Sequence, residues 1–284
     1  MILKQSTLNL FFPQWQGAGN ISLHEGACQL RDAPSPRRTF TSVPVSQTYS
    51  LSTQQNILGY SQIVEQLWHA CRILSRKQPC KIFTLGGDCG VELAPISYLN
   101  AQYDSSIAII WLDAHGDLNT PKTSPSGHFH GMPLRSLLGE GQLSIQARLF
   151  STLRAEQIFL VGTRELDLSE SKFIQRCDLS VTSVRTINQN KFDNLVSQIK
   201  RAGFKRLYLH VDLDVLDSQV FSAVACPTPK GIELSSLMHL MNVLTANFEV
   251  VGSSLLEALP TQPKEKDIAL CILNSLTLEN ASSS

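Results

Sequence analysis

The chain has 284 residues, of which 43% are hydrophobic and 17% are charged, a balance that suits a globular protein with a large apolar core. Its 24 basic and 24 acidic residues give zero formal net charge, which argues against binding to nucleic acid or to an anionic membrane. The seven cysteines lack the spacing of a zinc ribbon or a disulfide scaffold, and no apolar run resembles a membrane span or a signal peptide. We therefore expect a cytoplasmic protein with reduced thiols that acts on a small molecule.

Strand-like and helix-like segments alternate along the chain, and most of the expected strands are short continuous apolar runs typical of buried parallel strands. In chain order, the expected elements are a helix over 61–75, strands over 81–85, 107–112 and 158–162, a helix over 190–202, a strand over 207–211, a helix over 234–244, a strand over 249–255 and a helix over 264–276. This order predicts an α/β fold with a mainly parallel sheet covered by helices on both faces. The polar stretch 32–55 gives no clear pattern. Because no linker divides the chain, we expect one domain over residues 1–284.

Three potential metal ligands follow the expected strand over 107–112. Asp113, His115 and Asp117 alternate with small residues, so an extended backbone would place all three side chains on one face. One strand end could then hold a divalent cation. Taken alone, an Asp-x-His-x-Asp run is about equally consistent with a solvated turn.

More candidate ligands follow other expected strands. Asp212 and Asp214 come after a later strand, and Glu257 follows the last one. A Gly-Gly-Asp-Cys-Gly segment, which contains Cys89, follows an earlier strand. Ligands of parallel sheets bind beyond the carboxyl ends of the strands, so four strand ends should converge on one crevice. This convergence disfavours the reading as a solvated turn.

In the order and spacing of these motifs, from Gly86 to Pro260, the chain resembles the ureohydrolases, the family of arginases and agmatinases. The resemblance implies a single ureohydrolase domain with a three-layer α/β/α sandwich, and two bound Mn2+ ions. Carboxylate oxygens with an imidazole suit Mn2+ better than zinc. The ligands it implies are, for site A, Cys89, Asp113, Asp117 and Asp212, and, for site B, Asp113, His115, Asp212 and Asp214.

The resemblance also assigns catalytic roles in the hydrolysis of a guanidine. Two adjacent cations would lower the pKa of a shared water, and the hydroxide would attack the guanidinium carbon. Asp117 would hold the hydroxide as well as ligate the metal. His130 would protonate the leaving amine, and Glu257 would orient the guanidinium.

Further residues match those that bind the amino-acid end of the substrate in arginases. Asn119 and Ser126 would contact the α-carboxylate, and Asp167 would contact the α-amino group. This set favours arginine or a derivative over agmatine. A serine or an aspartate after a strand is also common as a helix cap, which remains the alternative for Ser126 and Asp167.

Three residues depart from the family pattern. Cys89 stands where a histidine is usual, His128 where an asparagine is usual, and Cys226 where a threonine lines the pocket near the guanidinium. A thiolate in place of neutral imidazole adds one negative charge to the site, which should raise the pKa of the bound water. Because sulfur is a soft ligand, site A either prefers another divalent metal over Mn2+ or is weak or empty.

Three functions remain open. In having a cysteine in site A, the chain resembles the N-hydroxyarginine hydrolases. This resemblance predicts hydrolysis of N-hydroxy-L-arginine to L-ornithine and hydroxyurea. The second is ordinary arginase activity, from L-arginine to ornithine and urea. The third is a metal-poor, non-catalytic regulatory relative, although retaining so many mutually repelling carboxylates argues against it. The resemblance also allows a homo-trimer, for which the sequence carries no signal of its own.

A few polar residues near these motifs have a structural interpretation. His210 precedes Asp212 but has no partner pattern, so we expect a structural role for it. Asp88 and Asp217 are expected to brace loops through hydrogen bonds.

Overall fold

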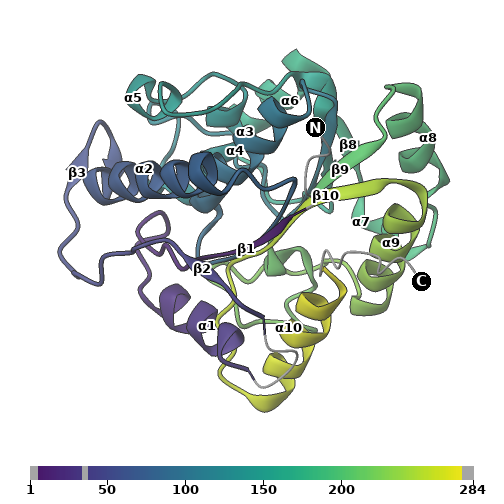
Figure 1. Cartoon of the computed structure of the whole chain (residues 1–284). Helices are drawn as coiled ribbons and strands as arrows, with labels where there is room; N and C mark the ends of the chain where they lie inside the picture. The colour runs from purple at the N-terminus through teal and green to yellow at the C-terminus, as the bar shows by residue number, and fades with distance from the viewer. Residues whose placement is uncertain (1–5, 34–37, 277–284) are drawn as a thin grey trace.

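A parallel sheet of eight strands forms the centre of the protein, seen here in a computed structural model that describes residues 6–33 and 38–276 (Figure 1). In spatial order the strands are β2 (Thr41–Ser42), β1 (Thr7–Phe12), β5 (Lys81–Gly86), β10 (Glu249–Leu255), β9 (Arg206–Val211), β6 (Ile107–Leu112), β7 (Ile158–Val161) and β8 (Ser180–Thr182). A separate antiparallel hairpin pairs β3 (Thr53–Gln54) with β4 (Ile57–Leu58).

Helices form the two outer layers (Figure 1). One layer holds α1 (Ser22–Arg31), α7 (Val184–Asn188), α8 (Asp193–Arg201), α9 (Leu234–Asn247) and α10 (Pro263–Ser275). The other holds α2 (Tyr60–Lys77), α3 (Leu93–Gln102), α4 (Pro133–Leu137), α5 (Leu143–Gln146) and α6 (Leu168–Cys177). The fold is therefore the expected three-layer α/β sandwich. Among the described residues, no helix combines the length and apolar character needed to cross a membrane.

The sheet buries side chains on both faces. Along β9, Leu207 and Leu209 pack into the apolar core beneath α7 to α10, whereas Tyr208 packs into the core on the opposite face. Because every residue of β6 is buried, this strand reads as a continuous apolar run and was predictable from sequence.

The five expected strands and the four expected helices are present, but one helix begins late and several others, α3 among them, were not predicted. The helix expected over 190–202 begins only at Asp193, because Asn190 has a left-handed φ of 56° that separates α7 from α8. The sequence patterns did not predict α3, whose residues from Leu93 to Asn100 are all buried. A helix buried all round shows no amphipathic stripe.

Short 3-10 turns follow two central strands and shape the carboxyl edge of the sheet. The turn η1 (Cys89–Glu92) follows β5, and Asp88 caps it by accepting a hydrogen bond from the Gly90 amide at 2.9 Å. The turn η4 (Leu213–Val215) follows β9, where Asp212 Oδ1 accepts from the Asp214 amide at 2.7 Å. Each turn bends the chain directly after the strand and leaves its acidic or thiol side chains at the sheet edge.

The loop-bracing roles expected for two aspartates are confirmed. Asp88 also accepts hydrogen bonds from Gln14 Nε2 at 2.9 Å and from the Gly17 amide at 2.8 Å. Asp217 accepts from the amides of Gln219 and Gly231, both at 2.9 Å.

Candidate metal centre

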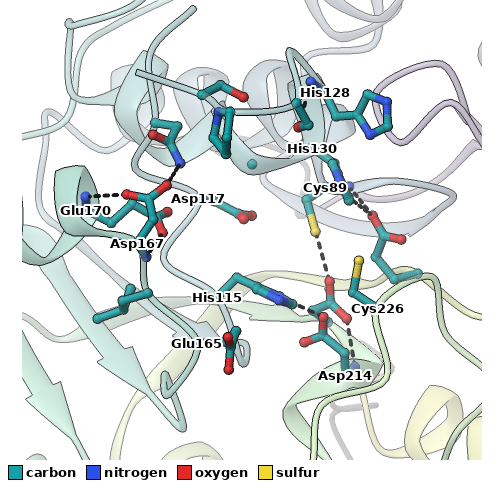
Figure 2. Close-up of a pocket in the computed structure, with 18 residues that line it drawn as sticks. Cys89, His115, Asp117, His128, His130, Glu165, Asp167, Glu170, Asp214 and Cys226 are labelled. Carbon is teal, nitrogen blue, oxygen red and sulfur yellow. Dashed lines mark hydrogen bonds and ion pairs between the residues drawn. The ribbon is translucent and has the colours of Figure 1, made fainter. Parts of the chain in front are cut away.

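A cavity of about 290 Å³ opens at the carboxyl edge of the sheet (Figure 2). Of the site residues predicted from sequence, all but Asp113 line it: Cys89, His115, Asp117, Asn119, Ser126, His128, His130, Asp167, Asp212, Asp214, Cys226 and Glu257. Asp113 lies directly behind the wall, 1% exposed, and contacts His115. The structure therefore brings the predicted residues together from separate strand ends.

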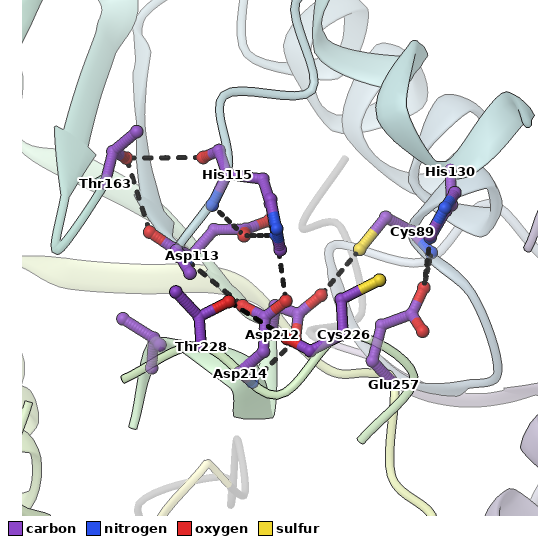
Figure 3. Close-up of polar contacts among 12 residues, drawn as sticks. Cys89, Asp113, His115, His130, Thr163, Asp212, Asp214, Cys226, Thr228 and Glu257 are labelled. Carbon is purple, nitrogen blue, oxygen red and sulfur yellow. Dashed lines mark hydrogen bonds and ion pairs between the residues drawn. The ribbon is translucent and has the colours of Figure 1, made fainter. Parts of the chain in front are cut away.

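His115 joins two aspartates from neighbouring strands (Figure 3). Its Nδ1 lies 2.9 Å from Asp214 Oδ2 and 3.4 Å from Asp113 Oδ1. Burial opposes protonation of His115, but its hydrogen bonds to Asp113 and Asp214 raise its pKa overall. These three residues offer ligand atoms within 4.8 Å of one another, which matches part of the expected site B.

Asp117 reaches the site differently from our expectation. The strand β6 ends at Leu112 and the chain bends over 113–115, so the backbone does not stay extended through the motif. Asp117 itself has a left-handed φ of 52°. Such a backbone conformation is uncommon outside glycine and often occurs at functional sites. The three ligands thus converge through a bend and not through strand alternation.

Cys89 is buried among acidic side chains. Its Sγ lies 3.1 Å from Asp212 Oδ2, and its amide donates to Glu257 Oε1 at 3.3 Å. Burial and the nearby charge of Asp212 raise the pKa of the Cys89 thiol. The sulfur is therefore protonated in the metal-free protein, and a bound metal would have to displace that proton.

Five carboxylates are concentrated in this small volume, none of them more than 4% exposed: Asp113, Asp117, Asp212, Asp214 and Glu257. Burial and the charge of Asp113 raise the pKa of Asp117, and they raise that of Asp214 to about 6. Asp117 Oδ2 and Glu257 Oε2 are buried and have no hydrogen-bond partner among residues 6–33 and 38–276. Buried acids with unpaired oxygens are costly unless a cation compensates them, so the donor set fits divalent metal ions.

His130 and Glu257 form a pair at the cavity wall. His130 Nδ1 lies 3.2 Å from Glu257 Oε1 (Figure 3). Burial opposes protonation of His130, but the hydrogen bond and the charge of Glu257 raise its pKa overall. The imidazole can therefore hold a proton at the cavity. Glu257 has a left-handed φ of 61°, a second uncommon backbone conformation in this site.

The residues expected to bind the amino-acid end of the substrate all line the cavity, and Figure 2 shows Asp167 on the side away from His130. Asn119 Nδ2 donates to Asp167 Oδ2 at 2.7 Å. Asp167 Oδ1 accepts from the Glu170 amide at 3.0 Å, so it also caps α6. Ser126 Oγ accepts from the His128 amide at 3.2 Å. Asp167 therefore caps a helix, as the alternative predicted, and it also lines the cavity.

Glu170 and His210 are buried polar residues near the cavity that were not predicted as site residues. Glu170 is 5% exposed and holds the amides of Leu118 and Asp167 at 3.0 and 3.1 Å. Its spacing three residues after Asp167 is the signature of a capping box, which could have identified it. His210 is fully buried, and its Nε2 lies 3.3 Å from Asp113 Oδ2. Its position two residues before Asp212 on a strand places both on one face of the sheet.

Comparisons with known proteins agree with this geometry. A family model described as the arginase family matches residues 21–279. An arginase from Staphylococcus aureus strain MRSA252 is 28% identical over 215 residues, which cover 74% of this chain and 71% of the relative. An arginase from strain COL is 31% identical over 172 residues, so the match spans 58% of this chain and little more than half, 57%, of that relative.

The fold has close counterparts among solved structures. The native arginase from Bacillus caldovelox superposes with a TM-score of 0.85, covering 98% of this chain and 100% of that one, at 22% sequence identity. At this identity the similarity concerns the fold alone.

Proposed function

Since the chain belongs to the arginase family of metal-dependent hydrolases that act on guanidino C–N bonds, we propose that it hydrolyses N-hydroxy-L-arginine to L-ornithine and hydroxyurea, using two divalent cations. The observation that carries this proposal is Cys89. Its sulfur lies among the candidate ligands, 3.1 Å from Asp212, at the position where the family pattern has a histidine. Water adds its oxygen to the guanidino carbon, and the bond from that carbon to the ornithine nitrogen breaks.

The metal ligands we assign are Cys89, Asp113, Asp117, Asp212 and Asp214, with His115. When bound, a pair of divalent cations supplies Lewis-acid activation of water near neutral pH. The raised pKa values of Asp117 and Asp214 support this assignment, because cations would stabilise the ionised carboxylates.

The protein's own groups then handle protons and orientation. Asp117 Oδ2 has no hydrogen-bond partner in the part of the chain that the structure describes, so it can accept a hydrogen bond from the attacking water. Glu257 Oε2, likewise without a partner among the described residues, can accept one from the guanidinium. His130 holds a proton beside Glu257 and donates it to the departing amine nitrogen, since an amine leaves readily only when protonated.

Recognition of an α-amino acid rests on the opposite cavity wall. Asp167 offers a carboxylate to the α-amino group, while Asn119 and Ser126 offer polar groups to the α-carboxylate. His128, which lines the same cavity, replaces the usual asparagine and adds a second ring near His130, with 5.9 Å between ring centroids. This wall supports an arginine derivative over a decarboxylated substrate.

Cys89 favours the hydroxylated guanidine through charge. With a neutral imidazole as the remaining ligand, four carboxylates, two divalent cations and a hydroxide give the site a net charge of minus one. A thiolate in place of that imidazole changes the net charge to minus two. More negative charge makes the activated water less acidic and lowers the supply of hydroxide. An N-hydroxylated guanidine is less basic, so more of it is neutral and open to attack at a given pH.

Ornithine release by the Mn2+-loaded protein tests this proposal, with L-arginine and N-hydroxy-L-arginine assayed in parallel. We expect faster release from the hydroxylated substrate, and Cys89→His should shift the preference toward arginine. Cys80→Ala, at a buried cysteine outside the cavity, is the control and should leave the preference unchanged. If Cys89→His changes both rates by the same factor, the tuning role of Cys89 is wrong.

Ordinary arginase activity is the second candidate, supported by the cavity wall that fits an α-amino acid. Faster ornithine release from L-arginine would establish it in place of the first. A non-catalytic role would require a metal-poor protein. Metal analysis after Mn2+ loading distinguishes the catalytic from the non-catalytic candidates. We expect close to two ions per chain, and a content well under one ion would exclude both enzymatic candidates.

A further inference from the structure

A row of buried polar side chains runs from the metal centre into the core behind it. His210 lies on β9 two residues before Asp212, and its ring stacks on Trp111 with 3.5 Å between centroids and an interplanar angle of 11°. Behind it, Glu92 of η1 is fully buried. Burial of a histidine and a glutamate costs free energy unless their polar atoms are paired, so their position against the site requires an explanation.

Glu92 fixes the orientation of the His210 ring. Glu92 Oε1 lies 2.8 Å from His210 Nδ1 and also accepts a hydrogen bond from Ser254, while Oε2 accepts from Tyr208 Oη at 2.5 Å. A carboxylate that accepts here holds the proton on Nδ1, so Nε2 is the ring nitrogen that faces the opposite way, where it can bind a metal once it carries no proton. Metal-binding histidines are typically held in this manner by a carboxylate.

The Nε2 atom of His210 faces the metal centre. Its Nε2 lies 3.3 Å from Asp113 Oδ2 and 4.0 Å from Cys89 Sγ. Cys89, Asp113, Asp117 and His210 each offer one ligand atom, and these atoms all lie within 4.8 Å of one another. We call these four residues the Cys89 site. Its fourth member comes from a strand position that the family pattern does not assign to a ligand.

We propose that His210 is a ligand of the metal in the Cys89 site, held in place by Glu92. The chain thus carries an imidazole next to the position where the family's usual histidine has become Cys89. This inference rests on the proposed function in one respect, namely that the site binds metal. Sulfur and imidazole donors bind Zn2+, Co2+ or Fe2+ better than oxygen donors alone do, so we expect these ions to compete well with Mn2+ at the Cys89 site.

Binding of Co2+ to the full-length protein tests the proposal without using activity. The thiolate-to-cobalt absorption band reports the Cys89 site directly, and titration gives its affinity. We expect His210→Gln to weaken this site by more than about 100-fold and Glu92→Gln by roughly 10 to 100-fold, the usual cost of losing an outer partner of a ligand.

Tyr208→Phe is the matched control. It removes one hydrogen bond from the same buried Glu92 but leaves the contact between Glu92 Oε1 and His210 intact. We expect it to lower the free energy of unfolding while the affinity for Co2+ stays within about threefold of the original. Equal weakening by Tyr208→Phe and His210→Gln, or no weakening by either, would mean that His210 only stabilises the core.

A second measurement avoids variants of the buried row. X-ray absorption of the Co2+-loaded His115→Asn protein should still detect imidazole bound to cobalt, because His210 remains. Absence of imidazole scattering would overturn the proposal. Ornithine release by the unmodified protein is measured in parallel. If metal binding depends on His210 but no ornithine is released, the proposed function alone is contradicted. If ornithine is released but metal binding does not depend on His210, this inference alone is contradicted.

Discussion

His130 Nδ1 lies 3.2 Å from Glu257 Oε1, so the candidate general acid and the carboxylate that would orient the guanidinium form one pair. The two residues are 127 positions apart and come from different loops at the sheet edge. Their contact couples substrate orientation to proton delivery, because the same glutamate that receives the guanidinium also raises the pKa of His130.

This coupling predicts a pH effect for Glu257→Gln. The hydrogen bond to Glu257 and its charge raise the pKa of His130, so loss of that charge should lower the pKa of His130. Because the general acid must be protonated, the alkaline limb of the kcat/KM profile should move to lower pH. Glu165→Gln is the control, since Glu165 lines the same cavity. An alkaline limb that stays in place would show that His130 does not act as the acid.

Asp167 combines two roles that substitutions can separate. Asp167→Ser keeps an oxygen for capping α6 but loses the carboxylate that Asn119 contacts, so we expect a raised KM for the amino-acid substrate with nearly unchanged stability. Asp167→Ala should raise KM similarly and also lower the free energy of unfolding by about 1 kcal/mol. Chemical unfolding and steady-state kinetics measure the two effects. If the serine variant has normal KM, Asp167 is only a helix cap.

The sequence reveals much of this centre because its ligands follow strands. In a parallel sheet the carboxyl ends of all strands lie at one edge, so Asp113, Asp212 and Glu257 could be brought together by topology alone. The route of the chain beyond the strands was less predictable. Asp117 reaches the site through a bend and has a left-handed backbone conformation, which the alternating sequence pattern does not predict.

Contacts between residues distant in sequence account for what was missed. His210 and Glu92 are 118 positions apart, and only packing of η1 against β9 makes them neighbours. The sequence around each residue does not distinguish it from any other buried polar residue. The helix α3 was missed for a related reason, since burial on all sides is a property of the tertiary structure.

Removal of metal should make stability depend on pH in an unusual direction. Burial and the charge of Asp113 raise the pKa of Asp214 to about 6 in the folded protein, above its value of 3.8 when unperturbed. A carboxyl group with a raised folded pKa stabilises the fold when protonated, and this contribution is lost as pH rises through the folded value. The metal-free protein should therefore lose stability between about pH 4 and pH 7.

Chelation followed by chemical unfolding at several pH values measures this effect. Metal loading should restore stability near pH 7, because cations stabilise the ionised carboxylates. Asp214→Asn should flatten the decline in the metal-free protein, whereas Asp104→Asn, at a loop position far from the cavity lining, should not. A metal-free protein that becomes more stable from pH 4 to pH 7 would contradict the charge repulsion assigned to this site.

The close approach of two loops beneath Cys89 predicts a strict requirement for glycine at position 87. A Cβ atom at Gly87 would lie 1.9 Å from the carbonyl oxygen of Gln14, so Gly87→Ala must displace the backbone that leads into η1. We expect a loss of more than about 2 kcal/mol of unfolding free energy, together with weaker metal binding at Cys89. Gly131 also lines the cavity, and a Cβ atom there would have no described atom within 4 Å, so Gly131→Ala should change stability by less than about 0.5 kcal/mol. If the two variants are similarly stable, the backbone at Gly87 can move away from Gln14 at little cost and does not position Cys89.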